Sequence, residues 1–240
     1  MARSVASKKL MIKKDRNHTP IKYILFAFIW VFTSCGRDEL EFDLIVYEND
    51  FEQSNLDNIT GGNIMNFEGS KVIGNYNNDG FRLSINNLPK HSSVFVSFDL
   101  LLHDSWDGNT NGLDPEQPDI WYMDLNPLIP NSSPDDLRFE TTFSNGVCDF
   151  QICQVQSYPQ QYPYSASPKS GVYKTLPGLC LNSDNPKGTT VVWIQKTFQH
   201  KDNSLVIDFR DQLYQTNSPD AKCDESWSID NLEVRALIIK

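Results

Sequence analysis

Basic residues are in the minority in this sequence. Its 240 residues include 21 Lys and Arg against 31 Asp and Glu, which gives a formal net charge of -10 at pH 7. A nucleic-acid-binding protein needs a basic face to neutralise phosphates, so this balance argues against a nucleic-acid partner. Cations, neutral sugars and other proteins remain compatible with it.

Familiar catalytic motifs are also missing. The sequence has no G-x-S-x-G, no H-E-x-x-H and no phosphate-binding P-loop. Residues 39–43 do not match the E-x-D-x-x-E strand of β-sandwich glucanases. We therefore expect a non-catalytic protein. Because acidic residues are abundant, a two-carboxylate glycosidase stays open as an alternative.

Long apolar runs are absent apart from one, Ile24–Phe32, which is too short for a transmembrane helix of ~20 residues. It follows a strongly basic stretch and leads into small residues and Cys35. Basic, apolar and small regions in this order are typical of a secretory signal. Residues 1–34 are therefore expected to be a signal peptide, with Met1 or Met11 as its start. A buried helix of the mature fold would leave the one-sided charge unexplained.

The segment Phe32-Thr33-Ser34-Cys35 resembles a bacterial lipobox, with Phe where Leu is usual. The acidic stretch after the cysteine is similar to the surface-export signal of Bacteroidota lipoproteins. The resemblance implies lipidation at Cys35, an acidic tether over residues 35–43, and a place on the outer membrane facing outward. Contact with the membrane would then be through the lipid alone.

Four cysteines remain after Cys35, namely Cys148, Cys153, Cys180 and Cys223. An even number in an exported chain favours disulfides, and three pairings are possible. We prefer Cys148–Cys153, which closes a short loop, and Cys180–Cys223, which would tie a long insertion to the C-terminal strands. A zinc site is the alternative, but the spacings are not CxxC and no histidine flanks them.

Helical periodicity is nearly absent after residue 35, and β-rich runs with turn residues between them dominate. The expected strands are Leu44–Phe51, Lys71–Ile73, Phe81–Asn86, Ser93–Leu102, Asp119–Leu125, Leu137–Phe143, Thr189–Phe198, Ser204–Phe209 and Trp227–Ala236. This pattern predicts an all-β fold, a jelly-roll β-sandwich over residues 44–240. Residues 144–188 interrupt it and are expected to form a long, disulfide-tied loop insertion.

Aromatic residues offer candidate contacts for a sugar. Tyr158, Tyr162 and Tyr164 lie in the polar insertion, where exposed rings would stack on sugar faces, and Trp106 and Trp121 are possible companions. The alternative for tryptophans in strands is the core. We expect Trp121, Trp193 and Trp227 to be core residues.

Two segments far apart in the sequence, residues 50–52 and residues 227–234, together resemble the extracellular jelly-roll superfamily that includes MAM-like domains and carbohydrate-binding modules. The resemblance implies that the first and last strands lie side by side and that acids from each hold a structural calcium. Glu52 and Asp230 would be the ligands, with Asp50 beside them. The alternative is that Asp230 caps a turn and Glu52 is solvated.

A second calcium site is indicated by Asp107, Asn109, Asn111 and Gly112, which match the opening of a calcium-binding loop. The bidentate Glu expected at loop position twelve is missing, and Asp119 follows one residue later. Oxygen side chains around a glycine suit a hard cation. The same composition also makes an ordinary Asn/Asp/Gly turn.

The chain over residues 46–236 also resembles an uncharacterised family of bacterial exported β-sandwich proteins, without a known activity. Together these features predict a lipid-anchored, calcium-stabilised surface module that binds glycan or protein. The alternatives are a polysaccharide-acting glycosidase on the same scaffold and a structural subunit of a surface assembly. A concave face with exposed aromatic residues would favour glycan binding, two carboxylates in a groove would favour hydrolysis, and a flat apolar patch would favour assembly.

Overall fold

The computed structural model describes residues 40–109, 117–126, 137–149, 153–180, 183–214 and 218–239, all within a unit that spans residues 38–240. Cys35 and Asn111 therefore lie outside the described residues. In chain order the strands are β1 (Leu40–Asn49), β2 (Ile59–Thr60), β3 (Ile64–Phe67), β4 (Ser70–Tyr76), β5 (Gly80–Asn86), β6 (Ser93–Asp104), β7 (Ile120–Leu125), β8 (Arg138–Thr142), β9 (Val172–Leu176), β10 (Thr189–Gln199), β11 (Ser204–Gln212) and β12 (Glu225–Ile239). A 3-10 helix, η1 (Ala221–Cys223), precedes β12. Among these residues no helix has the length and apolar character needed to span a membrane.

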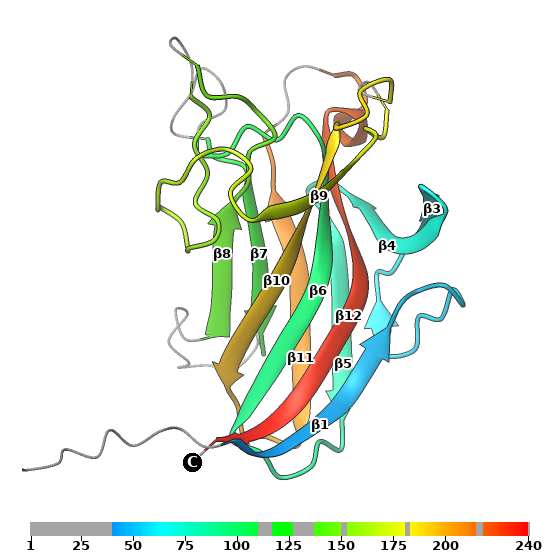
Figure 1. Ribbon diagram of the computed structural model, residues 1–240. Helices are drawn as coiled ribbons and strands as arrows, with labels where there is room; N and C mark the ends of the chain where they lie inside the picture. The colour runs from blue at the N-terminus through cyan, green and yellow to red at the C-terminus, as the bar shows by residue number, and fades with distance from the viewer. Residues whose placement is uncertain are drawn as a thin grey trace, which may run out of the picture. The chain divides into compact units, whose positions relative to one another are not determined.

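The strands form two antiparallel sheets. The seven-stranded sheet has the order β3-β4-β12-β6-β10-β9, with β1 added beside β12, and the five-stranded sheet has the order β2-β5-β11-β7-β8. In Figure 1 the seven-stranded sheet lies in front of the five-stranded one. This arrangement confirms the all-β sandwich. Each of the nine expected strands overlaps a strand of the structure, and only β2, β3 and β9 were not expected.

Alternating side chains fill the space between the sheets. In β6, Val94, Val96, Phe98 and their alternate neighbours point inward with no exposed surface, as the period-2 pattern predicts. The ring of Phe98 meets that of Phe209 from the opposite sheet edge-on, with centroids 5.5 Å apart. Each large apolar side chain buried in this way contributes roughly 1.5–3 kcal/mol to folding.

Strand β12 organises the seven-stranded sheet. One of its edges pairs with β6, and the other is shared by β4, beside residues 227–229, and β1, beside residues 232–239. The first and last strands are therefore neighbours, as expected. Where β4 gives way to β1, Asp230 pairs with Asp99 and Glu233 with Ser97, so β12 holds one extra residue there. In this β-bulge Asn231 has a φ of 52°, a conformation that asparagine tolerates better than most residues.

Two buried histidines join the turns at one end of the sandwich. The Nδ1 of His91 lies 2.6 Å from the carbonyl of Pro89, and its Nε2 lies 2.7 Å from Nδ1 of His200. The carbonyl can only accept, so His91 donates to it through Nδ1 and accepts from His200 through Nε2. The two imidazoles stack with centroids 5.0 Å apart. Both histidines thus serve packing and hydrogen bonding between turns.

The insertion over residues 144–188 is more regular than expected. Its segment β9 pairs with β10 and so extends the seven-stranded sheet by one strand. The disulfides Cys148–Cys153 and Cys180–Cys223 are both present, which confirms the preferred pairing. Figure 1 shows the insertion gathered at one end of the sandwich, around β9.

Removing the Cys180–Cys223 link should cost more stability than removing the Cys148–Cys153 link. The first pair is 43 residues apart and the second 5, and a longer closed loop restricts the unfolded chain more. Replacing both cysteines of a pair by alanine should lower the free energy of unfolding by about 4 kcal/mol for the long loop and about 2 kcal/mol for the short one. Urea unfolding of both variants and the parent protein measures this. Equal losses, or none, would contradict the expectation.

Candidate functional site

Two aromatic side chains stand on the outer face of the seven-stranded sheet. Trp193 on β10 is 55% exposed and Tyr173 on β9 is 57% exposed. The expectation that Trp193 is a core residue was therefore wrong, whereas Trp121 and Trp227 are fully buried as expected. The reason is the alternation of β10: its neighbours Val192 and Ile194 point inward, which turns Trp193 outward.

Tyr173 is tied to the middle of the sheet by hydrogen bonds. Its hydroxyl donates to Oδ1 of Asp99 over 2.8 Å, and Nδ2 of Asn231 donates to Oδ2 of the same carboxylate over 2.9 Å. Because β10 lies between β9 and β6, the tyrosine side chain reaches across β10. Burial, and then the hydrogen bond with Asp99, raise the pKa of Tyr173. The phenol therefore remains protonated and keeps donating to Asp99.

Three adjoining depressions surround this hydrogen-bonded bridge, and Asn231 lines all of them. The first, of about 550 Å³, is lined by Asp99, Gly171, Tyr173, Trp193 and Asn231. The second, of about 140 Å³, lies between β9 and the β3–β4 hairpin and includes Ser70, Lys174 and Asp230. The third, of about 520 Å³, lies at the end of β1 and includes Glu48, Asp50 and Glu233. We call these three depressions together the outer groove.

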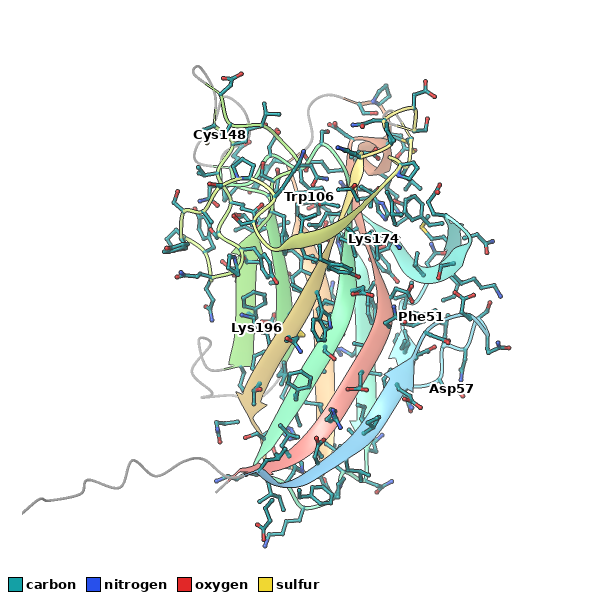
Figure 2. The ribbon with its side chains drawn as sticks, viewed as in Figure 1. Phe51, Asp57, Trp106, Cys148, Lys174 and Lys196 are labelled. Carbon is teal, nitrogen blue, oxygen red and sulfur yellow. A yellow bond between two sulfur atoms is a disulfide. The ribbon has the colours of Figure 1, made fainter. Side chains whose placement is uncertain are left out.

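The residues expected to stack on sugars lie elsewhere. Trp106 is fully buried, and its Nε1 donates to the carbonyl of Ser226 over 2.9 Å inside the sandwich (Figure 2). Tyr158 is 8% exposed and donates its hydroxyl to the carbonyl of Trp193 over 3.1 Å. Neither offers a ring to a ligand, so both expectations are corrected. Tyr164 is 44% exposed and Tyr162 is half-buried, but neither lines the outer groove.

The first expected calcium site is partly assembled. Ser70 Oγ lies 2.6 Å from Oε1 of Glu52 and 3.3 Å from Oδ2 of Asp230, so these two acids are neighbours, as predicted. Burial is the largest cause that raises the pKa of Asp230 to about 6, whereas hydrogen bonds from Ser70 and Lys71 lower that of Glu52. Oδ1 of Asp50 accepts from the backbone N–H of Glu52 over 3.1 Å, and Asp50 also lines the third depression. Calcium bound by Glu52 and Asp230 stays a prediction.

At the second expected calcium site, Asp107 and Asp119 form an acidic triad with Glu225, in which each residue offers an oxygen within 4.8 Å of the other two. Asp119 precedes β7 and has no exposed surface, and Glu225 begins β12 and is 3% exposed. The sequence predicted Asp107 and Asp119 but missed Glu225. It lies far along the chain, and no local spacing marks it, so only the pairing of β12 with β6 brings it there.

Asn109 was expected to be a ligand in this loop, but its side chain is engaged with the insertion. Its Nδ2 donates to the carbonyl of Tyr164 over 2.6 Å, and its Oδ1 accepts from the hydroxyls of Thr142 and Ser157. The amide therefore holds the insertion against β8, which corrects the expectation. Whether Asn111 approaches the triad lies outside the described residues.

Burial of the triad makes its negative charge costly. It raises the pKa of Asp119 to about 7 and that of Asp107 to about 6, with repulsion from Asp224 adding to the second. Carboxylate oxygens are the ligands preferred by hard cations such as Ca²⁺, which takes six to eight of them. The three carboxylates of the triad could therefore hold such an ion.

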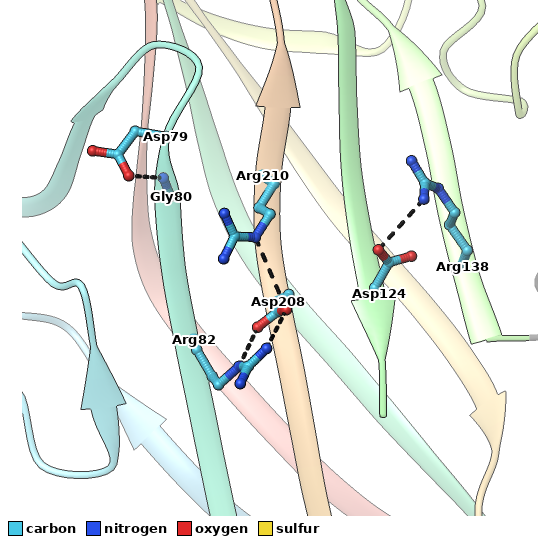
Figure 3. Close-up of polar contacts among 7 residues, drawn as sticks. All are labelled: Asp79, Gly80, Arg82, Asp124, Arg138, Asp208 and Arg210. Carbon is cyan, nitrogen blue, oxygen red and sulfur yellow. Dashed lines mark hydrogen bonds and ion pairs between the residues drawn. The ribbon is translucent and has the colours of Figure 1, made fainter. Parts of the chain in front are cut away.

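The outer face of the five-stranded sheet has a different chemistry. Asp208 of β11 is held by Arg82 through two hydrogen bonds of 2.6 and 2.7 Å, and Arg210 lies 3.9 Å from the same carboxylate (Figure 3). Asp124 and Arg138 form a further ion pair on this sheet, at 3.5 Å. Acids on that face are therefore matched by arginines.

No protein-family model and no curated protein matches the sequence. Among solved structures, the chain resembles the CBM22-2 xylan-binding domain from Paenibacillus barcinonensis at 10% identity and a TM-score of 0.37, covering 80% of this chain and 99% of that one. A carbohydrate-binding module from Cellvibrio mixtus lichenase 5A, in complex with cellotriose, matches at 10% identity and 0.33, covering 80% and 97%.

A family GH115 4-O-methyl-α-glucuronidase with specificity for decorated arabinogalactans also matches, at 12% identity and a TM-score of 0.35. That match covers 80% of this chain, which spans only 17% of the length of the enzyme. At such low TM-scores these similarities assign neither a ligand nor an activity to this chain.

The raised pKa of Asp119 predicts how its removal alters stability. Its folded-state pKa of about 7 exceeds the ordinary aspartate value, so the folded state is relatively favoured at low pH and loses stability as pH rises through 7. In chelator at pH 8, Asp119→Asn should therefore raise the free energy of unfolding by about 2–4 kcal/mol, with little effect at pH 4. Urea unfolding at both pH values checks this. Equal destabilisation at both would contradict it, and the exposed Asp57→Asn serves as control.

Proposed function

We propose that the chain is a non-catalytic glycan-binding module whose site is the outer groove. The observation that carries the proposal is the exposure of Trp193 and Tyr173 around one depression with Asp99 and Asn231. Sugar rings have apolar faces that match flat aromatic rings, and their hydroxyls need polar partners. Aromatic rings with a few convergent polar groups are the usual lining of a ligand site.

The polar part of the site is preorganised. Tyr173 and Asn231 each donate to one oxygen of Asp99, which fixes the carboxylate in place. Each carboxylate oxygen accepts more than one hydrogen bond, so capacity remains for sugar hydroxyls. Groups already held in the binding geometry lose little freedom when the ligand arrives, which favours affinity.

Residues below the surface support the aromatic pair. Tyr158 packs against Phe143 with centroids 5.1 Å apart and bonds the backbone of Trp193. Gly171 has a φ of 80°, and a Cβ there would meet the Tyr158 ring at 2.4 Å. This close approach places the start of β9, and with it Tyr173, against β10. Tyr158 is thus a positioning residue rather than a contact for the ligand.

Substitution of Trp193 tests the glycan-binding proposal. Trp193→Ala should weaken binding at least about tenfold, since a stacked aromatic anchor is often worth 1–3 kcal/mol or more. Because the side chain is exposed, stability should change little. Tyr173→Phe should weaken binding less, by freeing one oxygen of Asp99. Affinity electrophoresis against a panel of polysaccharides, followed by calorimetry on those that bind, measures both.

The matched control is Tyr164→Ala, because Tyr164 is exposed but does not line the outer groove. It should bind like the parent protein. A glycan that binds the parent and the Trp193 variant equally would place the site elsewhere, and failure of every polysaccharide in the panel would contradict the proposed function.

We also propose that Ca²⁺ binds the acidic triad and stabilises that end of the sandwich. A cation there offsets the negative charge whose burial makes ionised Asp119 unfavourable. It stabilises only the folded state, by ~2.7 kcal/mol at a hundredfold excess over Kd. Excess Ca²⁺ should therefore raise the free energy of unfolding of the parent at pH 8 by more than it raises that of Asp119→Asn. A parent protein whose melting ignores both Ca²⁺ and chelator would contradict calcium binding.

We further propose that the protein is a bacterial surface lipoprotein, anchored in the outer membrane through lipid on Cys35 and facing outward. The lipobox-like segment and the acidic residues after it support this. Cys35→Ser should abolish acyl labelling and release the protein into the soluble fraction. A Cys35→Ser variant that is still acylated and membrane-bound would overturn the anchor. Either a glycan or another surface protein would then be within reach of the groove.

A further inference from the structure

Acidic side chains dominate the outer groove. Those that line its three depressions are Glu48, Asp50, Glu68, Asp99, Asp230 and Glu233. Among the described residues, the one basic side chain that lines them is Lys174. The site proposed to bind glycan therefore combines two exposed aromatic rings with a large excess of negative charge.

Four of these acids face one another across paired strands. Asp230 of β12 is directly opposite Asp99 of β6, and Glu48 of β1 is directly opposite Glu233 of β12. Like charges at opposite positions of an antiparallel pair destabilise the sheet. The groove thus carries two unfavourable pairs that a positive group would relieve.

Nearby basic residues relieve this only in part. Lys71 directs Nζ to the carbonyl of Glu52 over 2.8 Å. Arg235 pairs with Asp43 at 2.7 Å and lies 3.8 Å from Glu233. On the opposite face, by contrast, Asp208 has two arginines. The groove therefore lacks the balance between acids and arginines that is found around Asp208 on the opposite face.

We propose that the outer groove selects glycans by charge, and that its preferred ligand is a chain whose sugars carry free amino groups. This inference rests on the proposed function. Protonated amines would lie against Asp99, Asp230 and the Glu48–Glu233 pair, while sugar faces stack on Trp193 and Tyr173. Aromatic faces also attract cations, which adds to the same preference. Uronic acids and sulfated sugars meet repulsion at the same positions.

The test compares three oligosaccharides of equal length in the presence of chelator: glucosamine oligomers, their N-acetylated counterparts and galacturonate oligomers. At about 20 mM salt and pH 6 the amino oligomer should bind about fivefold more tightly than the neutral oligomer, and the acidic oligomer should bind more weakly than the neutral one. The expected difference is modest because exposed charge pairs contribute little and are screened by salt. At about 500 mM salt the three affinities should converge.

Neutralising one like-charge pair provides the matched variant. The double substitution Glu48→Gln with Glu233→Gln should reduce the ratio between the affinities for the amino oligomer and the neutral oligomer. The control is Asp57→Asn, an exposed acid on the loop after β1 that does not line the groove (Figure 2). Trp193→Ala should weaken binding of all three oligomers.

The outcomes separate the inference from the proposed function. If glycans bind but galacturonate binds as tightly as the neutral oligomer at low salt, or the amino oligomer has no advantage, charge selection is wrong and glycan binding stands. If no oligomer binds while a lysine-rich peptide binds and is lost in the double variant, the groove serves a basic protein segment, and both proposals fail. If Asp57→Asn changes the ranking as much as the double variant, net charge rather than the groove is responsible, which also overturns the inference.

Discussion

The geometry of the outer groove depends on one constraint, which is that two strands share one edge of β12. Strands β4 and β1 cannot both continue along that edge, so the pairing changes partner beside Asp230 and Asn231, and the extra residue of the bulge is accommodated there. Bulges redirect side chains, and this one places the Asn231 amide on the outer face within 2.9 Å of Asp99. All three depressions meet at Asn231, so the site follows from the way the first and last strands close the sheet.

Three functions were compatible with the sequence, and the described surface favours one of them. Exposed aromatic rings beside fixed polar groups favour binding of a glycan. A surface assembly would need a broad apolar patch. The exposed large apolar side chains of β1, Leu40, Leu44 and Ile45, are 54%, 46% and 41% exposed and lie on a single strand. The binding module accounts for the most observations.

Much of the fold was predictable because its signals are local. Alternation in Ser93–Leu102 identifies a strand with one buried face, and the cysteine spacing favours the pairing that the structure contains. The site was less predictable because its signals are not local. Trp193 lies in an apolar run, which suggests a core residue. Its outward orientation follows only once Val192 and Ile194 are assigned to the inward face of the strand. Glu225 joins Asp107 and Asp119 only through strand pairing across the sheet, which no spacing along the chain encodes.

The central claim is that a glycan covers Trp193 on the outer face. Acrylamide quenching of tryptophan fluorescence tests it most directly, because Trp106, Trp121 and Trp227 are buried and Trp193 is the exposed tryptophan of the described residues. The contribution of Trp193 is isolated by subtracting the signal of a Trp193→Phe variant. A saturating oligosaccharide should shield this component from acrylamide. Binding detected by calorimetry without any loss of quenching at Trp193 would contradict the account.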